Sequence, residues 1–152
     1  MHKFTITVFL VIFCSLIYAQ ENGDFSLCDD GKLAPYYYPE LKYEGGFYVI
    51  TSFFKENYNT NKFKGVNDVT GIVTIQFHVN CSGQTGDYII KNVDLDYNEN
   101  HINAELNSHL LDLTKMLDKW TPAKDDNQNT VNSHKFLSFR IIDGKLVEIF
   151  PK

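Results

Sequence analysis

The stretch from Gly71 to Tyr88 most constrains how this chain can fold. Every second residue from Val73 to Val79 is apolar and the residues between them are polar, which is the pattern of a strand with one buried face. β-type sequence resumes at Tyr88 after a cluster of turn-forming residues, which are Asn80, Ser82, Gly83, Thr85 and Gly86. The stretch therefore predicts a β-hairpin whose apolar face the rest of the chain must cover.

One amphipathic helix is predicted on each side of the hairpin. The first runs from Phe47 to Asn57, and its apolar residues recur near helical spacing: Phe47, Ile50, Phe53, Phe54 and Tyr58. The second has Asn98 and Asn100 as candidate N-caps, and its apolar residues lie three or four positions apart: Ile102, Leu106, Leu110, Leu113 and Leu117. Pro122 ends this helix, because the residue before a proline is pushed out of the helical region.

Two more strands are predicted near the C-terminus. In the stretch from Lys135 to Ile142 alternate residues are apolar, namely Leu137, Phe139 and Ile141. Asp143 and Gly144 then form a strong hairpin-turn signal, and alternation resumes from Lys145 to Phe150. The order helix, hairpin, helix, strand predicts an α+β fold in which a small antiparallel sheet packs against two helices.

Composition favours one globular domain. The 152 residues are 43% hydrophobic and 22% charged, which suits a folded domain rather than a disordered chain. The formal net charge of -5 leaves no basic footprint for nucleic acid or for anionic lipid. We therefore expect no nucleic-acid partner.

Residues 1–19 have the layout of a secretory signal peptide, with a short basic start, an apolar middle and a small residue, Ala19, at the cleavage position. The alternative is an uncleaved anchor, but the apolar run from Phe4 to Leu16 is shorter than the roughly 20 residues that span a bilayer. We expect cleavage, no stable membrane anchor afterwards, and a periplasmic or secreted protein. Residues 20–38 are then an N-terminal arm, and residues 39–152 are the folded domain.

Cleavage of the signal peptide leaves two cysteines, Cys28 and Cys81, in an oxidising compartment. One disulfide between them is the simplest interpretation, and it would attach the N-terminal arm to the hairpin turn. Two unpaired thiols stay open as the alternative, because pairing geometry is not visible in a sequence.

Several short motifs resemble the C-terminal periplasmic domain of TonB, in the form common in Bacteroidota-like proteins. They lie at the start of the first helix, in the hairpin, around the second helix and in the strand after it: Tyr43-Glu44-Gly45-Gly46-Phe47, Gly71 to Asn80, Gly83, Gly86, Leu95-Asp96, Trp120-Thr121-Pro122-Ala123 and Phe139-Arg140-Ile141. The resemblance covers roughly Pro39 to Ile149. It implies a small sheet on two helices, and a domain that binds partners rather than transforming substrates.

The resemblance also implies a binding mode. In TonB domains the last sheet strand resembles an open edge to which an extended partner segment adds, and the stretch from Lys135 to Ile142 occupies that place here. The residues expected to line this edge are Lys135, Phe136, Ser138, Arg140 and Ile142. The expected partner is an outer-membrane receptor or another envelope protein, and a homodimer stays open. The alternative is an edge that its charged residues keep inert.

The chain also departs from the energy transducers of that family, which resemble an inner-membrane anchor followed by a long Pro-rich spacer. It has four prolines in total and shows no such spacer. Force transmission from an inner-membrane motor therefore does not carry over with the resemblance.

The stretch after the hairpin is close to a calcium-binding loop, because its oxygen-bearing side chains stand near the required spacing: Asp94, Asp96, Asn98 and Glu105. Glu99 stands where the calcium pattern requires Gly, and a strand rather than a helix precedes the loop. The simpler interpretation is a polar loop that leads into a helix. An exported calcium-binding domain with a structural or adhesive role is the alternative function.

The titratable residues form no recognisable catalytic constellation. His78 and Asp87 stand near Cys81 in the hairpin, but Cys81 is better explained by a disulfide. The remaining histidines of the expected mature chain, His101, His109 and His134, lack metal-ligand spacing. We therefore predict a non-catalytic protein-binding domain without a cofactor.

Overall fold

The computed structural model describes residues 25–29, 31–34 and 41–151. Within these ranges the elements are β1 (Leu33–Ala34), β2 (Lys42–Tyr43), α1 (Gly46–Asn57), α2 (Thr60–Phe63), β3 (Gly71–Val79), β4 (Thr85–Val93), α3 (Ala104–Lys115), β5 (Trp120–Thr121), β6 (Ala123–Lys124), β7 (Thr130–Ile142) and β8 (Lys145–Phe150). The predicted signal peptide at residues 1–19, and part of the predicted arm, lie outside the described residues.

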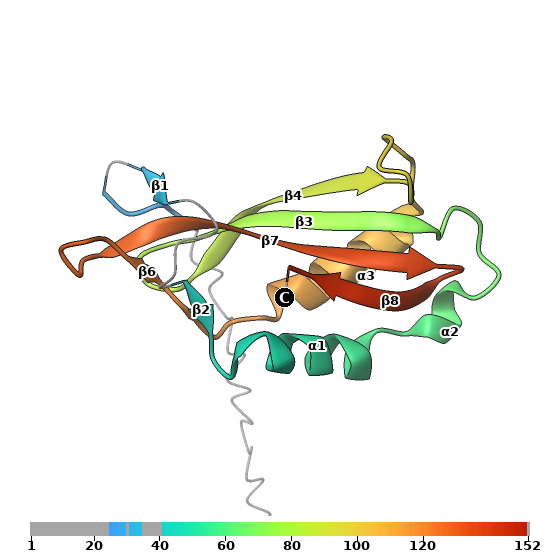
Figure 1. The fold of residues 1–152 in the computed structure, drawn as a ribbon, viewed down its shortest axis with the longest axis horizontal. Helices are drawn as coiled ribbons and strands as arrows, with labels where there is room; N and C mark the ends of the chain where they lie inside the picture. Colours follow the sequence, from blue (N-terminus) through green and yellow to red (C-terminus); the bar gives the residue numbers. More distant parts are fainter. Residues whose placement is uncertain (1–24, 30, 35–40, 152) are drawn as a thin grey trace, which may run out of the picture.

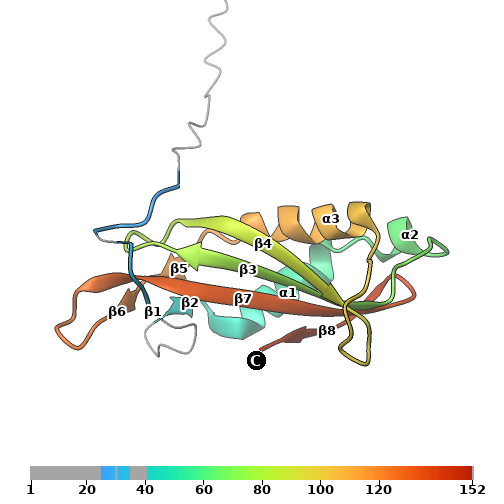
Figure 2. The same ribbon diagram turned by 90° about the horizontal axis from the view of Figure 1, so that it is seen from above.

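The fold is α+β, with one main sheet and helices on one of its faces. Figure 1 shows α3 behind the long strands and α1 along the lower margin of the sheet, next to β8; Figure 2 gives the same arrangement from above. In the described part of the chain the longest helices have 12 residues, too few and too polar for any of them to cross a membrane.

The main sheet has β4, β3 and β7 side by side in antiparallel order. Three short strands also pair with β7: β8 and β6 run antiparallel to it, and β1 runs parallel to it. β2 and β5 form a separate two-stranded pair. The sheet is therefore mixed rather than purely antiparallel, because the N-terminal arm joins it as a parallel strand.

The helix-facing side of the sheet is apolar, as the alternation in β3 predicted. The four alternating apolar residues of β3 are at most 1% exposed. In the register between β3 and β7, Leu137 lies opposite Ile75 and Phe139 lies opposite Val73, so β7 extends the same apolar face. The hydrophobic core lies between this face and the helices.

Helix α1 is fixed to the sheet at two points. Phe54 is fully buried, and the centre of its ring lies 4.7 Å from that of Phe139. At the C-terminal end of α1, the hydroxyl of Tyr58 donates a hydrogen bond to the carbonyl of Gly144 at 2.9 Å. Burial raises the pKa of Tyr58 to about 12, so this donor keeps its proton. These contacts set the position of α1 relative to the hairpin of β7 and β8.

Helix α3 begins later than predicted. Its N-cap is Asn103, whose side-chain oxygen accepts from the backbone N–H groups of Glu105 and Leu106 at 3.0 and 3.1 Å. The predicted caps, Asn98 and Asn100, belong to the preceding loop. The predicted apolar stripe is nevertheless buried, with each of these residues at most 6% exposed: Ile102, Leu106, Leu110, Leu113 and Leu117.

Three five-residue turns, which begin at Asn80, Asp94 and Asp125, share one hydrogen-bond pattern. In each, a side-chain oxygen of the first residue accepts from the backbone N–H groups of the third and fifth residues, at 2.8–3.0 Å. The N–H of the first residue donates to the carbonyl of the fifth at 2.9 Å. The fourth residue is left-handed, with φ of 83, 67 and 67°. An Asn or Asp at the first position thus organises each turn.

These turns make stability depend on pH. Backbone and side-chain hydrogen bonds from Asn98 and Asn129 lower the pKa of Asp94 and of Asp125 in the folded protein. A carboxylate with a lowered folded pKa stabilises the protein above its unfolded pKa of about 3.9, and this contribution is lost as pH falls through the folded pKa. We expect the free energy of unfolding to decrease below about pH 4. Urea unfolding across that range measures the decrease.

The double variant Asp94→Asn, Asp125→Asn separates charge from turn geometry. An asparagine oxygen can still accept both backbone hydrogen bonds, so the fold is retained while the titrating groups are removed. The variant should therefore lose less stability on acidification than the parent. Equal losses in the two proteins would show that Asp94 and Asp125 are not the source of the acid sensitivity.

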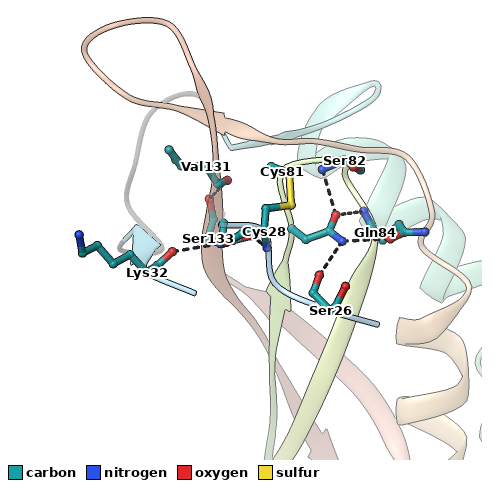
Figure 3. Close-up of a disulfide and its surroundings, with 10 residues drawn as sticks. Ser26, Cys28, Lys32, Cys81, Ser82, Gln84, Val131 and Ser133 are labelled. Atoms are coloured by element: carbon teal, nitrogen blue, oxygen red, sulfur yellow. Dashed lines mark hydrogen bonds between the residues drawn. A yellow bond between two sulfur atoms is a disulfide. The ribbon is translucent and has the colours of Figure 1, made fainter. Parts of the chain in front are cut away.

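The disulfide joins Cys28 to Cys81, as predicted (Figure 3). Beside it, the amide of Asn132 donates to the carbonyl of Cys28, and its oxygen accepts from the N–H of Cys28, both at 2.9 Å. The side chain of Asn80 also donates to the carbonyl of Ser26 at 3.0 Å. The described part of the arm is therefore attached to both β7 and the hairpin turn.

Candidate binding groove

The predicted edge strand lies inside the sheet. β7 pairs with β3 from Ser133 to Ile141 and with β8 from Ser138 to Ile142. Asp143 and Gly144 have φ of 49 and 73°, the left-handed pair of a tight hairpin turn, and this turn folds β8 onto the outer side of β7. The prediction of an open edge is therefore wrong for the paired stretch from Ser138 to Ile142.

The five predicted edge residues do not share one surface. Side chains alternate between the two faces of a strand, and only Lys135 lies on the helix side, in register with Leu137. Its ammonium lies 5.9 Å from the centre of the Trp120 ring. The open face of the sheet carries Phe136, Ser138 and Arg140, and Ile142 lies at the hairpin end, 38% exposed.

Two of the residues on the open face bond within the sheet. The hydroxyl of Ser138 shares a hydrogen bond of 2.8 Å with that of Thr74. Arg140 Nε lies 3.7 Å from a carboxylate oxygen of Glu148 in β8. These side chains therefore stabilise strand pairing.

Strand β4 forms one outer edge of the sheet, and only part of it pairs with β3 in an unshifted register. Its register with β3 shifts near Asp87, which has a left-handed φ of 52°. The Phe25 ring lies so close to Gly86 that a side chain at Gly86 would collide with it. At the other end, Val93 bridges to Glu99. Other parts of the chain therefore lie against both ends of β4.

Strand β8 forms part of the opposite edge, and a groove separates it from α1. In the described chain β8 pairs only with β7. The groove has a volume of about 360 Å³, and its two walls consist of Phe47, Thr51 and Lys55 from α1 and Leu146, Val147, Glu148 and Ile149 from β8. The three α1 residues are four positions apart and so lie on one face of the helix. Val147 is 56% exposed and is left out of the β7 register, so it forms a bulge in this wall.

A second hollow, of about 370 Å³, lies next to the first, and Phe47 lines both. Three aromatic rings, two lysines and several apolar residues line it: Tyr43, Phe47, Trp120, Lys42, Lys135, Leu41, Ile50, Gly46 and Pro151. The two hollows together run along α1 from Lys55 to Gly46. We call the two hollows together the α1–β8 groove.

Lysines give the α1–β8 groove a positive lining. Lys55 lies at one end, and Lys42 and Lys135 lie at the other. Burial lowers the pKa of Lys135, because a desolvated ammonium is disfavoured. Glu148 is the one acid among the described lining residues, and it lies beside Arg140. A positive groove stands out in a chain whose net charge is -5.

The predicted calcium-loop residues are used for other contacts. Asp94 holds its own turn, where its carboxylate accepts from Asp96 and Asn98. Glu105 lies in the first turn of α3, and its carboxylate is 3.0 Å from the ammonium of Lys62. Across the described ranges no three His, Cys, Asp or Glu side chains come together in a way that could hold a metal ion. The geometry therefore does not favour the calcium alternative.

The hairpin histidine contacts an acid and a second histidine. His78 Nδ1 lies 3.0 Å from a carboxylate oxygen of Asp87, and the centres of the His78 and His134 rings are 5.7 Å apart. Burial lowers the pKa of His134, and the nearby charges of His78 and Lys91 lower it further. Cys81, which would be the nucleophile, is consumed in the disulfide. The cluster therefore lacks the thiol that a catalytic interpretation requires.

Sequence reasoning missed the α1–β8 groove, although one signal points to it. Lys135 stands directly before a run of alternating apolar residues, on the same face as Leu137, Phe139 and Ile141. A charge in line with a core stripe indicates that the core ends there or opens to a pocket. Which helix closes that pocket is decided by contacts between distant segments.

Comparisons of the chain with protein-family models, with curated proteins and with solved structures found no match.

Proposed function

We propose that this protein is an exported, non-catalytic protein-binding domain that captures a short extended segment of a partner in the α1–β8 groove. The observation that carries the proposal is that an edge strand of the sheet borders a groove. The disulfide supports an oxidising compartment, either the periplasm or the outside of the cell.

The physical basis is strand addition. The outer side of an edge strand presents backbone N–H and C=O groups at the spacing of a β-ladder, so an extended segment can continue the sheet. A groove beside the edge adds pockets for the side chains of that segment, and these give specificity. On β8 one wall of the groove is the strand itself and the other is α1.

The edge of β8 suits this role better than the edge of β4. Both strands have a bulge, at Asp87 in β4 and at Val147 in β8, but β4 is also contacted by Phe25 at one end and bridged by Glu99 at the other. The pockets that could receive side chains lie along β8. The bulge at Val147 turns an apolar side chain outward at the groove, where a partner could cover it.

The resemblance to the C-terminal domain of TonB supports the same binding mode. In that family an extended partner segment adds to the last strand of the sheet. The resemblance places that strand at residues 135–142, and β8 is the strand that forms the edge outside it here. An outer-membrane receptor or another envelope protein is the proposed partner class. The calcium alternative receives no support from the contacts of Asp94 and Glu105.

An NMR titration tests the proposal. The probes are two end-blocked heptapeptides of alternating threonine and valine, with the residues next to both ends replaced by glutamate in one peptide and by glutamine in the other. We expect chemical-shift changes confined to β8 and to the groove-lining face of α1. Changes confined to β4, or none with either peptide, would overturn the proposal.

A variant that fills the groove tests the same proposal by mutation. Thr51→Trp places a large ring between α1 and β8 and should weaken peptide binding at least about tenfold. Tyr48→Trp is the control, because Tyr48 lies on the same helix, is 79% exposed and does not line the groove. Equal affinities for the two variants would show that the peptide binds elsewhere.

A further inference from the structure

Lys135 occupies a position that would otherwise belong to the hydrophobic core. It lies opposite Phe77 in the register of β3 and β7, and Phe77 is 1% exposed. Its ammonium lies 5.9 Å from the centre of the Trp120 ring, so an aromatic side chain faces the charge. A lysine at such a site has given up much of its hydration.

No acid among the described residues compensates this charge. Ion pairs in the described chain join Lys62 to Glu105, His78 to Asp87, Lys119 to Glu44 and Arg140 to Glu148, and none of these four includes Lys135. The indole Nε1 of Trp120 is also buried without an acceptor. The second hollow thus combines a half-buried cation with aromatic walls.

This combination fits a ligand that brings its own negative charge. A partly desolvated ammonium gains more from a carboxylate than a solvated one does, because the attraction is screened less. Lys55 at the far end adds charge of the same sign, and Glu148 already lies beside Arg140. A neutral or basic segment would leave Lys135 buried without a counter-ion.

We propose that the α1–β8 groove selects segments with an acidic side chain near one end, and that the second hollow receives this carboxylate at Lys135. The inference rests on the proposed function, since it names the chemistry of the segment that adds to β8. Apolar side chains of the same segment then lie in the first hollow, against Phe47, Leu146 and Val147.

The glutamate and glutamine peptides test this selectivity. An added segment can run in either direction along β8, and glutamate near both ends places one carboxylate at the second hollow in each case. We expect the glutamate peptide to bind the unmodified protein about tenfold more tightly than the glutamine peptide. In Lys135→Met, which keeps an unbranched apolar side chain on the core face, the difference should disappear. In Lys135→Arg, which keeps the charge, part of it should remain.

Lys91→Met is the matched control, because it removes an exposed lysine from β4 on the other edge of the sheet. It should leave the preference for glutamate unchanged. Equal affinities of the two peptides for the unmodified protein, with shifts still in the groove, would overturn this inference and leave the proposed function standing. If neither peptide causes chemical-shift changes, both this inference and the proposed function are contradicted.

Discussion

Replacing both Cys28 and Cys81 with serine is expected to lower the free energy of unfolding by about 4 kcal/mol. The two cysteines are 53 positions apart, so the disulfide closes a long loop and removes conformational freedom from the unfolded chain. The hydrogen bonds between Cys28 and Asn132 use backbone atoms of Cys28, so the variant retains the groups that attach the arm to β7. The stability is therefore lost mainly because the unfolded chain gains conformational entropy, and not because the folded state changes.

Urea unfolding of the double variant, the oxidised parent and the reduced parent measures this effect. The reduced parent is the control for the serine substitutions, and it should match the variant. The folded states should give the same far-ultraviolet circular dichroism. If reduction leaves the unfolding midpoint of the parent unchanged, then the disulfide does not constrain the unfolded chain as expected.

Phe54→Ala is expected to lower the free energy of unfolding by about 3–5 kcal/mol. Phe54 is fully buried between α1 and the sheet, where its ring packs against Phe139. Truncation removes apolar contacts and leaves a cavity that the neighbouring strands can fill only in part. Because α1 is one wall of the groove, the variant should also bind the heptapeptides less tightly.

Tyr48→Ala is the matched control for the stability measurement. Tyr48 lies on the same helix but is 79% exposed, so its truncation removes little buried surface. Denaturant unfolding of both variants gives the comparison. Equal stabilities of the two variants would mean that α1 does not pack on the sheet through Phe54.

The elements specified by neighbouring residues could be predicted from the sequence. The alternation in β3 and the apolar stripe of α3 both identify the side that is buried. The turn at Asp143 and Gly144 has the left-handed backbone that this residue pair favours. The disulfide could be predicted from the cysteine count of the expected mature chain.

The start of α3 shows where local reasoning was insufficient. Asn98 and Asn100 are suitable N-cap types, but Asn98 closes a five-residue turn with Asp94, and Asn103 caps the helix instead. The spacing from Asp94 to Asn98 recurs from Asp125 to Asn129, in a stretch that leads from β6 into β7. The sequence therefore did contain a signal for these turns. It is an acid or amide at one position and an amide four residues later.

By itself the sequence determined which side chains are buried, because a period of two or of about 3.6 follows from the geometry of one strand or one helix. Only the tertiary structure decided which strand has an open edge. β7 has the same alternation whether it lies at the rim or in the middle, and its place was settled when the Asp143–Gly144 hairpin put β8 outside it. The α1–β8 groove likewise exists because Phe54 and Tyr58 hold α1 in place against distant parts of the chain. Backbone pairing and helix docking join residues far apart in sequence, and for that reason periodicity within a single segment does not reveal them.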